Sequence, residues 1–295
     1  MKTIEYHIET ITNLHVGSGE ANFGVVDRLI QKDAATGFPN INASSIKGAL
    51  RELFEAQTQQ DNKKNIETIF GSKPNDDENR EAGLFRFFDA YLLGMPVRCD
   101  KAPFLMGTCP RLIRDYIRFC HLFGCSLDEN LTKAIEQILN KVVENKPLVF
   151  SKNYKDALIE DFENESTYYD VKDKEEQGKA VKWLKNILKK PVVLFADQEF
   201  LRLCDEDHLP VIARNNLTKD HENLWYEQVL PRFSILYTFV MMPEELNQEK
   251  DTKTKESLFN EILDKAKVVQ LGANATVGYG YCKFTKKNNP NASSL

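Results

Sequence analysis

Residues 1–19 read MKTIEYHIETITNLHVGSG, and this stretch predicts how the fold begins. Apolar and polar side chains alternate from Lys2 to Thr12, and the apolar positions on one side are Ile4, Tyr6 and Ile8. A period of two is typical of a β-strand that packs against a core on one face. The Gly17–Gly19 segment holds two glycines, which favour a tight loop with close backbone approach. We therefore expect an N-terminal strand that leads into a glycine loop.

Apolar residues recur further along the chain at helical and strand-like spacings. The Asn42–Ser45 segment offers an N-cap to the first predicted helix, and a Ser126-x-x-Glu129 capping box opens the third. The predicted helices cover residues 44–54, 110–124, 126–142, 181–188 and 258–266, of which the second and third form a helical hairpin. Short apolar runs predict further strands at residues 192–195, 233–241, 268–271 and 279–284.

The order of these elements predicts the fold class. Strands separated by helices, with a strand at each end, favour an α+β sheet of ferredoxin-like (RRM-like) type. The chain holds no linker rich in Pro, Ser and Gly, so we expect a single domain over residues 1–295 that carries insertions. The segment 152–178 is charged and without periodicity, and we expect an exposed or partly disordered loop there.

The composition is that of an ordinary globular protein, with 42% hydrophobic and 28% charged residues and a formal net charge of -5. A negative chain is unusual for a nucleic-acid binder, because phosphate contacts normally need surplus Lys and Arg. The charge is unevenly distributed, however. Residues 156–176 are densely acidic, whereas Lys47–Arg51, Arg98–Arg118 and Lys283–Lys287 lean basic, so a local positive groove is compatible with the sequence.

The sequence also indicates a cellular compartment. Its start lacks the charged and apolar regions of a secretory signal, and no apolar run is long enough to span a bilayer, so we expect a cytoplasmic protein with no membrane partner. The six cysteines show no paired spacing and should be free thiols. Zinc binding by Cys120 with Cys125, or by Cys204 with His208, is disfavoured because Cys120 lies on the apolar stripe of its predicted helix.

The start of the helix at Ser44 is unusual. Its first turn holds Lys47 where a capping box would have Glu or Gln, and a cation there opposes the positive end of the helix dipole. Gly48 costs about 1 kcal/mol relative to Ala in a helix interior. A bound phosphate would explain both features, because exposed N–H groups, Lys47 and Arg51 would together cradle an anion. An ordinary solvated helix face remains the alternative.

A second glycine segment lies between the last two predicted strands, at Asn274–Tyr281. Such a segment is more often a plain hairpin than a ligand loop. If the first and last strands are neighbours, however, this loop, the Gly17–Gly19 loop and the Ser44 helix start would line one groove, with Tyr279 or Tyr281 available for stacking on a base.

Few residues stand out as candidates for catalysis. Asp27 lies within an apolar run, where a carboxylate is either exposed at an edge or held for a purpose. Among the histidines, only His15 lies in a glycine loop, and the others are too dispersed for a pair of catalytic histidines. The sequence contains no Walker loop, no G-x-S-x-G elbow and no H-E-x-x-H motif.

Several blocks of the chain together resemble the RAMP (repeat-associated) protein family. They are Leu14–Gly19, Val26-Asp27, Thr36–Pro39, Ser44–Arg51, Gly83–Arg98, Asn223–Pro231 and Gln270–Gly280. The Gly83–Arg98 block in particular is similar to the backbone subunits of type III-B CRISPR (Cmr) effector complexes. Three positions depart from the family pattern: Arg28 replaces an apolar residue, Ala43 a glycine, and Gln228-Val229 an acidic-aromatic pair.

The resemblance implies an RRM-like palm with a helical and loop insertion near residues 90–190 and an inserted thumb β-hairpin. Residues 205–231 and the Ala90–Thr108 region are both candidates for the thumb. The implied protein is an endoribonuclease that depends on a divalent metal, Mg²⁺ or Mn²⁺. Its implied partners are guide crRNA, complementary target RNA, other Cmr subunits and copies of itself in a helical filament.

The resemblance also assigns residues to roles. Asp27 matches the family's essential aspartate and would hold the metal or accept a proton, and His15 and Glu227 match positions near the cut site. Ser44, Ser45, Lys47 and Arg51 match a cradle for the guide phosphates. Further expected RNA contacts are Gly17, Ser18, Arg98, Asn274, Gly278, Tyr279 and Gly280.

Three alternatives to a guided ribonuclease stay open at this point. The chain could be a scaffold that binds guide RNA without cutting, although Asp27 argues against this. It could process guide RNA alone, although the sequence lacks a convincing histidine pair. Finally, it could oligomerise without meeting nucleic acid, in which case its affinity for single-stranded RNA would not fall with salt.

Overall fold

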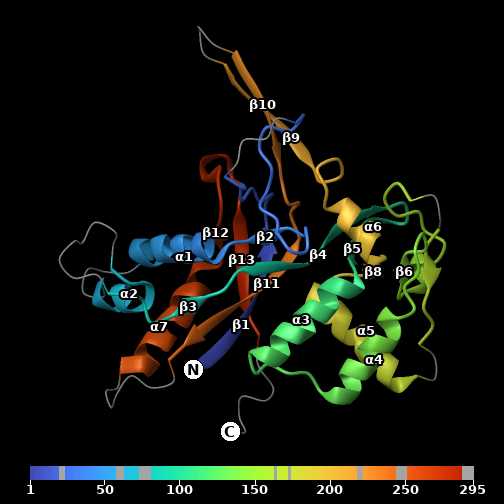
Figure 1. Cartoon of the computed structure of the whole chain (residues 1–295), viewed down its shortest axis with the longest axis horizontal. Helices are drawn as coiled ribbons and strands as arrows, with labels where there is room; N and C mark the ends of the chain where they lie inside the picture. The colour runs from blue at the N-terminus through green and yellow to red at the C-terminus, as the bar shows by residue number, and fades with distance from the viewer. Residues whose placement is uncertain are drawn as a thin grey trace.

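A large mixed sheet of 11 strands forms the centre of the part of the chain that the structure describes (Figure 1). The structure is a computed structural model, and it describes residues 1–19, 24–57, 63–72, 81–162, 165–171, 174–217, 222–243 and 251–287. The main path of the sheet runs in the order β12-β13-β1-β11-β4-β5-β8-β6-β7, with β2 paired to β4 and β3 paired to β11. The predicted α+β class is therefore confirmed.

The bounds of the elements are as follows. The strands are β1 Lys2–Thr10, β2 Asn40–Ile41, β3 Arg86–Phe87, β4 Ala90–Cys99, β5 Ala102–Thr108, β6 Leu148–Val149, β7 Thr167–Tyr168, β8 Val192–Leu194, β9 Val211–Leu217, β10 Glu222–Gln228, β11 Ile235–Met242, β12 Val269–Gln270 and β13 Tyr281–Lys286. The helices are α1 Ala43–Gln57, α2 Lys63–Phe70, α3 Pro110–Leu122, α4 Glu129–Leu139, α5 Glu175–Leu188, α6 Asp197–Leu203 and α7 Asp251–Ala266.

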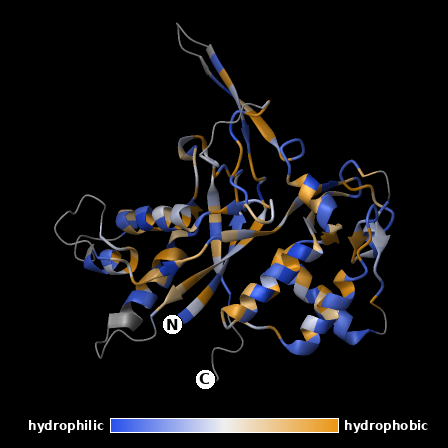
Figure 2. Cartoon of the chain, viewed as in Figure 1, coloured by the Kyte–Doolittle hydropathy of each residue, from blue (hydrophilic) through white to orange (hydrophobic). Residues whose placement is uncertain are grey.

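The helices gather in two groups beside the sheet, each with its own buried cluster (Figure 1). One group is α1, α2 and α7, where Phe54, Phe70 and Phe259 pack together. The other group is α3, α4 and α5, whose hydrophobic and hydrophilic residues segregate to different sides (Figure 2). Such amphipathic faces explain why the helical periodicity of the sequence located these helices well. The short α2 and α6 were not predicted, because one or two turns carry too little periodicity.

The first strand differs from its prediction. β1 lies between β13 and β11 and is covered on both faces, so Glu5 and His7 are buried as well as the apolar residues. Tyr116 of α3 donates a hydrogen bond of 2.6 Å to Glu5 Oε1, and His7 Nε2 lies 2.8 Å from the same oxygen. The expectation of one packed face was wrong because α3 supplies polar partners to what reads as a solvent-facing side.

The charged segment 152–178 also differs from its prediction. Ala157 and Ile159 are fully buried, and β7 pairs with β6 within the large sheet. Residues 163–164 and 172–173 lie outside the described part, but the rest is largely ordered against the body rather than an exposed loop. Ala157 and Ile159 pack in the main core cluster, and the surrounding charges hid them in the sequence. The helix predicted to start at Ser126 also differs from its prediction. Its N-cap is Asp128, whose side chain accepts from the N–H groups of Asn130 and Leu131.

Strands β9 and β10 form a separate two-stranded sheet that projects away from the large sheet (Figure 1). They lie inside the predicted thumb candidate 205–231, whereas the other candidate, Ala90–Thr108, forms β4 and β5 of the large sheet. The two strands pair antiparallel, with Trp225 opposite Arg214. None of the helices in the described ranges is both long and apolar enough to cross a membrane.

Candidate functional site

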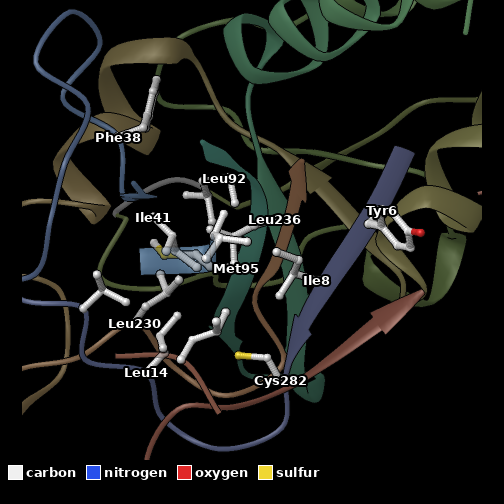
Figure 3. Close-up of a cluster of buried hydrophobic side chains, with 14 of the residues drawn as sticks. Tyr6, Ile8, Leu14, Phe38, Ile41, Leu92, Met95, Leu230, Leu236 and Cys282 are labelled. Atoms are coloured by element: carbon white, nitrogen blue, oxygen red, sulfur yellow. The ribbon is translucent and has the colours of Figure 1, made fainter. Parts of the chain in front are cut away.

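The candidate site lies where the chain after β1 meets the base of the β9–β10 hairpin. Leu14 and Leu230 exchange two backbone hydrogen bonds, of 2.9 and 2.8 Å, and both side chains point into the buried cluster around Ile8 (Figure 3). This pairing anchors the glycine loop and the hairpin to the same core. Residues 24–30 then run beside β10, because Tyr226 accepts from the N–H of Arg28 and Arg28 accepts from the N–H of Gln228.

Asp27 is held at this junction. Its residue is exposed, and its Oδ2 accepts a hydrogen bond of 2.7 Å from the backbone N–H of Tyr226. The carboxylate is thus fixed by the backbone of a strand that lies far away in sequence. The apolar run that made Asp27 conspicuous serves to anchor it, since Val26 and Ile30 on either side are buried.

Glu227 lies next to this point and is fully buried. Oε1 accepts from Trp225 Nε1 at 2.7 Å and from Arg28 NH1 at 2.9 Å, while Oε2 accepts from Asn274 Nδ2 at 2.7 Å. Burial by itself would raise the pKa of Glu227, but the hydrogen bonds from Trp225 and Asn274 and the charges of His15 and Arg214 outweigh it and lower the pKa. Glu227 is therefore a buried anion surrounded by hydrogen-bond donors and cations.

His15 is buried, and its Nδ1 lies 2.7 Å from the carbonyl oxygen of Gln228. Its own carbonyl accepts from the N–H of Ala273, which ties it to the second glycine loop. Gly17 lies directly beside the ring, since a Cβ at Gly17 would come 3.3 Å from His15 Nε2. His15 thus links both glycine loops to the hairpin.

The second glycine loop depends on close backbone contact. A Cβ at Gly280 would lie 1.9 Å from the carbonyl oxygen of Leu271, and the φ of Gly280 is +76°. The N–H of Gly280 donates to the carbonyl of Asn13, so the loop is attached to the chain that follows β1. This arrangement confirms that the first and last strands are neighbours, and it brings Asn274 to Glu227.

The start of α1 forms a second group of candidate residues. Ser44 is exposed and Ser45 and Lys47 are half-buried, and α1 packs against β12, which leads into the second glycine loop. The expected need for an anion is met in part within the protein, because Asp89 Oδ1 accepts from the N–H of Ala43 at 2.6 Å. Sequence reasoning missed Asp89 because only the pairing of β2 with β4 brings it to the helix start.

Two of the expected RNA-binding cations are engaged elsewhere. Arg51 pairs with Glu55 at 3.0 Å one turn along α1. Arg98 belongs to neither group, and it pairs with Glu160 and Asp161 of the acidic segment at 2.7 and 3.0 Å. The structure therefore joins Asp27, Glu227 and His15 to the glycine loops through a continuous set of hydrogen bonds. It leaves Arg98 in a different place.

Residues 7–283 match the RAMP superfamily, which covers nearly the whole chain. The chain belongs to this superfamily. Among similar proteins, the CRISPR system Cmr endoribonuclease Cmr4 of Pyrococcus furiosus is 28% identical over 299 residues, covering 97% of this chain and 96% of that protein.

Two solved structures share the RAMP fold with this chain. The type III-B Cmr-beta complex bound to cognate target RNA contains a chain that is 22% identical with a TM-score of 0.71, covering 97% of each chain. The oligomeric Cmr4 of Pyrococcus furiosus is 24% identical with a TM-score of 0.66, covering 97% of this chain and 98% of the other. At these identities the structures establish the fold of this RAMP protein.

This RAMP chain also holds a column of side chains whose grouping sequence reasoning missed. The Arg28 and Arg214 guanidinium carbons lie 5.5 and 5.9 Å from the Trp225 ring centroid, and that of Arg214 lies 5.6 Å from the Tyr279 centroid. The column therefore alternates cation and aromatic ring from the Asp27 segment, across the hairpin, to the second glycine loop. One signal was present in the sequence: Trp225 and Glu227 are two apart in a strand, so they share a face.

Asp27 is the residue of this RAMP chain that was predicted to hold a divalent metal. In the described part of the chain, no three side chains of His, Cys, Asp or Glu come together to enclose an ion. Mg²⁺ is commonly held by one or two carboxylates together with substrate phosphates and water. The exposed carboxylate of Asp27 fits that mode of binding, in which RNA supplies further ligands. Glu227 does not fit it, because both of its oxygens already accept hydrogen bonds.

Proposed function

We propose that this chain is a backbone subunit of a type III-B CRISPR effector complex, which binds guide crRNA and cleaves complementary target RNA at regular intervals. The observation that carries the proposal is the exposed Asp27 carboxylate, fixed by the Tyr226 N–H where a glycine loop meets the projecting hairpin. The family membership supports it, as do a relative named as a Cmr endoribonuclease and a related chain in a complex with cognate target RNA.

In this proposal the large sheet and its flanking helices act as a ferredoxin-like palm and the β9–β10 hairpin acts as the thumb. The hairpin projects from the body, which suits an element that reaches into a bound duplex. The protein would work in the cytoplasm, stacked against copies of itself in a helical filament and against other Cmr subunits. The oligomeric form of the related Cmr4 supports self-association.

The start of α1 would hold the guide RNA. Ser44 and Ser45 lie in its first turn and Lys47 follows directly after it, near the helix end whose dipole favours phosphate. The Ala43 N–H donates to Asp89, and the N–H groups of Ser45 and Ile46 donate to the Asn42 carbonyl, so a phosphate would bind mainly through the serine hydroxyls and Lys47. Because α1 packs against β12, guide phosphates bound there would lie on the side of the sheet that carries the second glycine loop.

The proposed reaction is attack of a ribose 2'-hydroxyl on the adjacent phosphate, with the 5'-oxygen as leaving group. Such a reaction needs in-line geometry at a distorted nucleotide more than it needs a protein nucleophile. In this proposal Asp27 would accept the 2'-hydroxyl proton or hold a divalent ion, Mg²⁺ or Mn²⁺. When bound, that ion would neutralise charge on the phosphate. Asp27 keeps its position through the Tyr226 N–H.

The test is cleavage of complementary RNA by the assembled complex with wild-type or Asp27→Ala subunits, in Mg²⁺ or Mn²⁺. We expect Asp27→Ala to abolish cutting at regular intervals while target RNA still binds. Continued cutting would remove Asp27 from the mechanism and the proposal with it. If the wild-type complex binds target RNA but cuts it in neither metal, the chain is a scaffold that does not cleave.

A further inference from the structure

We propose that Arg28 binds the reactive phosphate beside Asp27, as a catalytic residue of this chain, and that Glu227 and Trp225 position it. This inference rests on the proposed function, since it names a further group for the same cleavage. Arg28 and Asp27 are consecutive in sequence, and each is held by one of two consecutive residues of β10. Tyr226 donates its N–H to Asp27, and Glu227 accepts from Arg28.

Glu227 and Trp225 orient the guanidinium of Arg28 without using all of its N–H donors. Its NH1 donates to Glu227 Oε1 at 2.9 Å, and its central carbon lies 5.5 Å from the Trp225 ring. The side chain is 57% exposed. A guanidinium has five N–H groups in a fixed plane, so one bond to Glu227 leaves an edge directed at solvent that matches a phosphate.

The surroundings of Glu227 suit a residue that orients the Arg28 guanidinium rather than one that takes part in the reaction. It is fully buried, and its two oxygens accept from Trp225, Arg28 and Asn274. A proton-transfer residue must reach the proton that it moves, and a metal ligand needs an open oxygen. Glu227 meets neither condition. It is therefore a positioning residue that fixes the Arg28 guanidinium through a charge-assisted hydrogen bond.

Arg214 explains why Arg28 is the cation that faces RNA. Arg214 lies between the rings of Trp225 and Tyr279, at 5.9 and 5.6 Å, and its NH1 is 3.9 Å from Glu227 Oε2. One buried carboxylate thus faces two guanidinium groups. The inner cation, Arg214, is enclosed by aromatic rings, while Arg28 is the open end of the column beside Asp27.

The chemistry of phosphate attack calls for such a group. Negative charge builds on the non-bridging oxygens as the 2'-oxygen adds and the 5'-oxygen leaves, and preoriented N–H donors stabilise that charge. Removing one donor of this kind typically lowers the rate by about 10²-fold or more. A donor used mainly in the transition state affects the rate of cleavage more than the affinity for RNA.

The experiment measures single-turnover cleavage and target-RNA affinity in assembled complexes that carry Arg28→Ala, Arg28→Lys or Arg111→Ala. Arg111 is the matched control, because it is 54% exposed and also pairs with a carboxylate, Asp115. We expect Arg28→Ala to slow cleavage by about 10²-fold with affinity changed by less than about threefold. Arg28→Lys should retain part of the rate, and Arg111→Ala should match the wild type.

Two further measurements separate catalysis from structure. Added guanidinium ion should restore part of the cleavage rate of Arg28→Ala and leave that of Asp27→Ala unchanged. Trp225→Phe, which keeps the ring but removes the N–H donated to Glu227, should slow cleavage less than Arg28→Ala does. Its RNA affinity should be unchanged.

The possible failures are distinguishable. If Arg28→Ala cuts at the wild-type rate while Asp27→Ala does not cut, the role of Arg28 is overturned and the proposed function stands. If rate and affinity fall together and guanidinium restores nothing, Arg28 only stabilises the hairpin, and the inference fails. If Asp27→Ala itself still cuts, the proposed function fails first.

Discussion

The carboxylate oxygen Oδ2 of Asp27 accepts a hydrogen bond of 2.7 Å from the backbone N–H of Tyr226, although 199 residues separate the two in sequence. The bond attaches the segment that carries Asp27 to the base of the β9–β10 hairpin. Any movement of the hairpin would therefore displace Asp27. Under the proposed function, this bond would keep Asp27 at a fixed place relative to an RNA strand that the hairpin contacts.

Asp27→Asn should separate the anchoring of this segment from its chemistry. The amide oxygen of Asn can still accept from the Tyr226 N–H, but the side chain carries no charge and cannot accept a proton. We expect loss of cleavage as complete as in Asp27→Ala. The exchange of the Tyr226 amide hydrogen should stay slow in Asp27→Asn and become faster in Asp27→Ala. An active Asp27→Asn enzyme would contradict the proposed role of the charge.

Lys47→Ala should weaken the binding of guide RNA uniformly across sequences. Affinity falls with salt, and the loss of one phosphate contact makes the slope of log affinity against log salt shallower by about 0.7 for a single strand. Lys133→Ala is the control, because Lys133 is an exposed helical lysine on α4 that pairs with Glu129. The check is a salt titration of guide RNA binding. Equal slopes for the wild type and Lys47→Ala would remove Lys47 from the phosphate cradle.

Gly48→Ala and Gly178→Ala form a matched pair of substitutions in helices α1 and α5. A Cβ would meet nothing within 4 Å at either position, so each change should stabilise the free protein by about 0.5–1 kcal/mol. Only Gly48 lies in the proposed phosphate cradle, where the RNA backbone would approach the helix. We therefore expect Gly48→Ala to weaken guide RNA binding and Gly178→Ala to leave it unchanged. Equal binding by both would indicate that no RNA comes close to Gly48.

Lowering the pH below neutrality should destabilise the chain through His7 and Glu5. Burial lowers the pKa of His7 from its ordinary value of 6.5, although the hydrogen bond that His7 donates to Glu5 opposes this, so protons favour the unfolded chain once the pH falls through 6.5. Burial raises the pKa of Glu5, but bonds to His7 and Tyr116 outweigh it and lower the pKa from 4.5. The stability that Glu5 contributes is thus present above pH 4.5 and lost as the pH falls below it.

The measurement is urea unfolding at pH 7.5 and 5.5 for the wild type and His7→Gln. Gln can donate to Glu5 but does not titrate. Between these pH values the His7→Gln variant should therefore lose less unfolding free energy than the wild type, by up to about 1 kcal/mol. Tyr116→Phe is the companion variant, which removes a donor to Glu5 without removing the titration of His7. An identical pH dependence in the wild type and His7→Gln would show that His7 is not the titrating group.

Local sequence patterns predicted an element correctly where the buried face of that element alone set the spacing of its apolar residues. The helical spacing of Ile46, Leu50 and Phe54 predicted α1, because a buried stripe imposes a period of 3.6 whatever it packs against. Patterns failed where a distant segment changed the environment. Glu5 and His7 read as solvent-facing until α3 covered them, and the charge of residues 152–178 concealed Ala157 and Ile159.

The candidate site likewise combines residues that the sequence predicted with contacts that only the tertiary structure shows. The sequence by itself predicted the longer amphipathic helices, the first and last strands, the RAMP blocks and the candidate residues Asp27 and His15 with the glycine loops, because those signals are carried by neighbouring residues. Only the tertiary structure decided that Arg28 pairs with Glu227, that Trp225 stands between two arginines, and that Asp89 meets the start of α1. Those contacts join segments far apart along the chain. Periodicity does not encode them, since they arise only when the sheet sets which strand ends lie together.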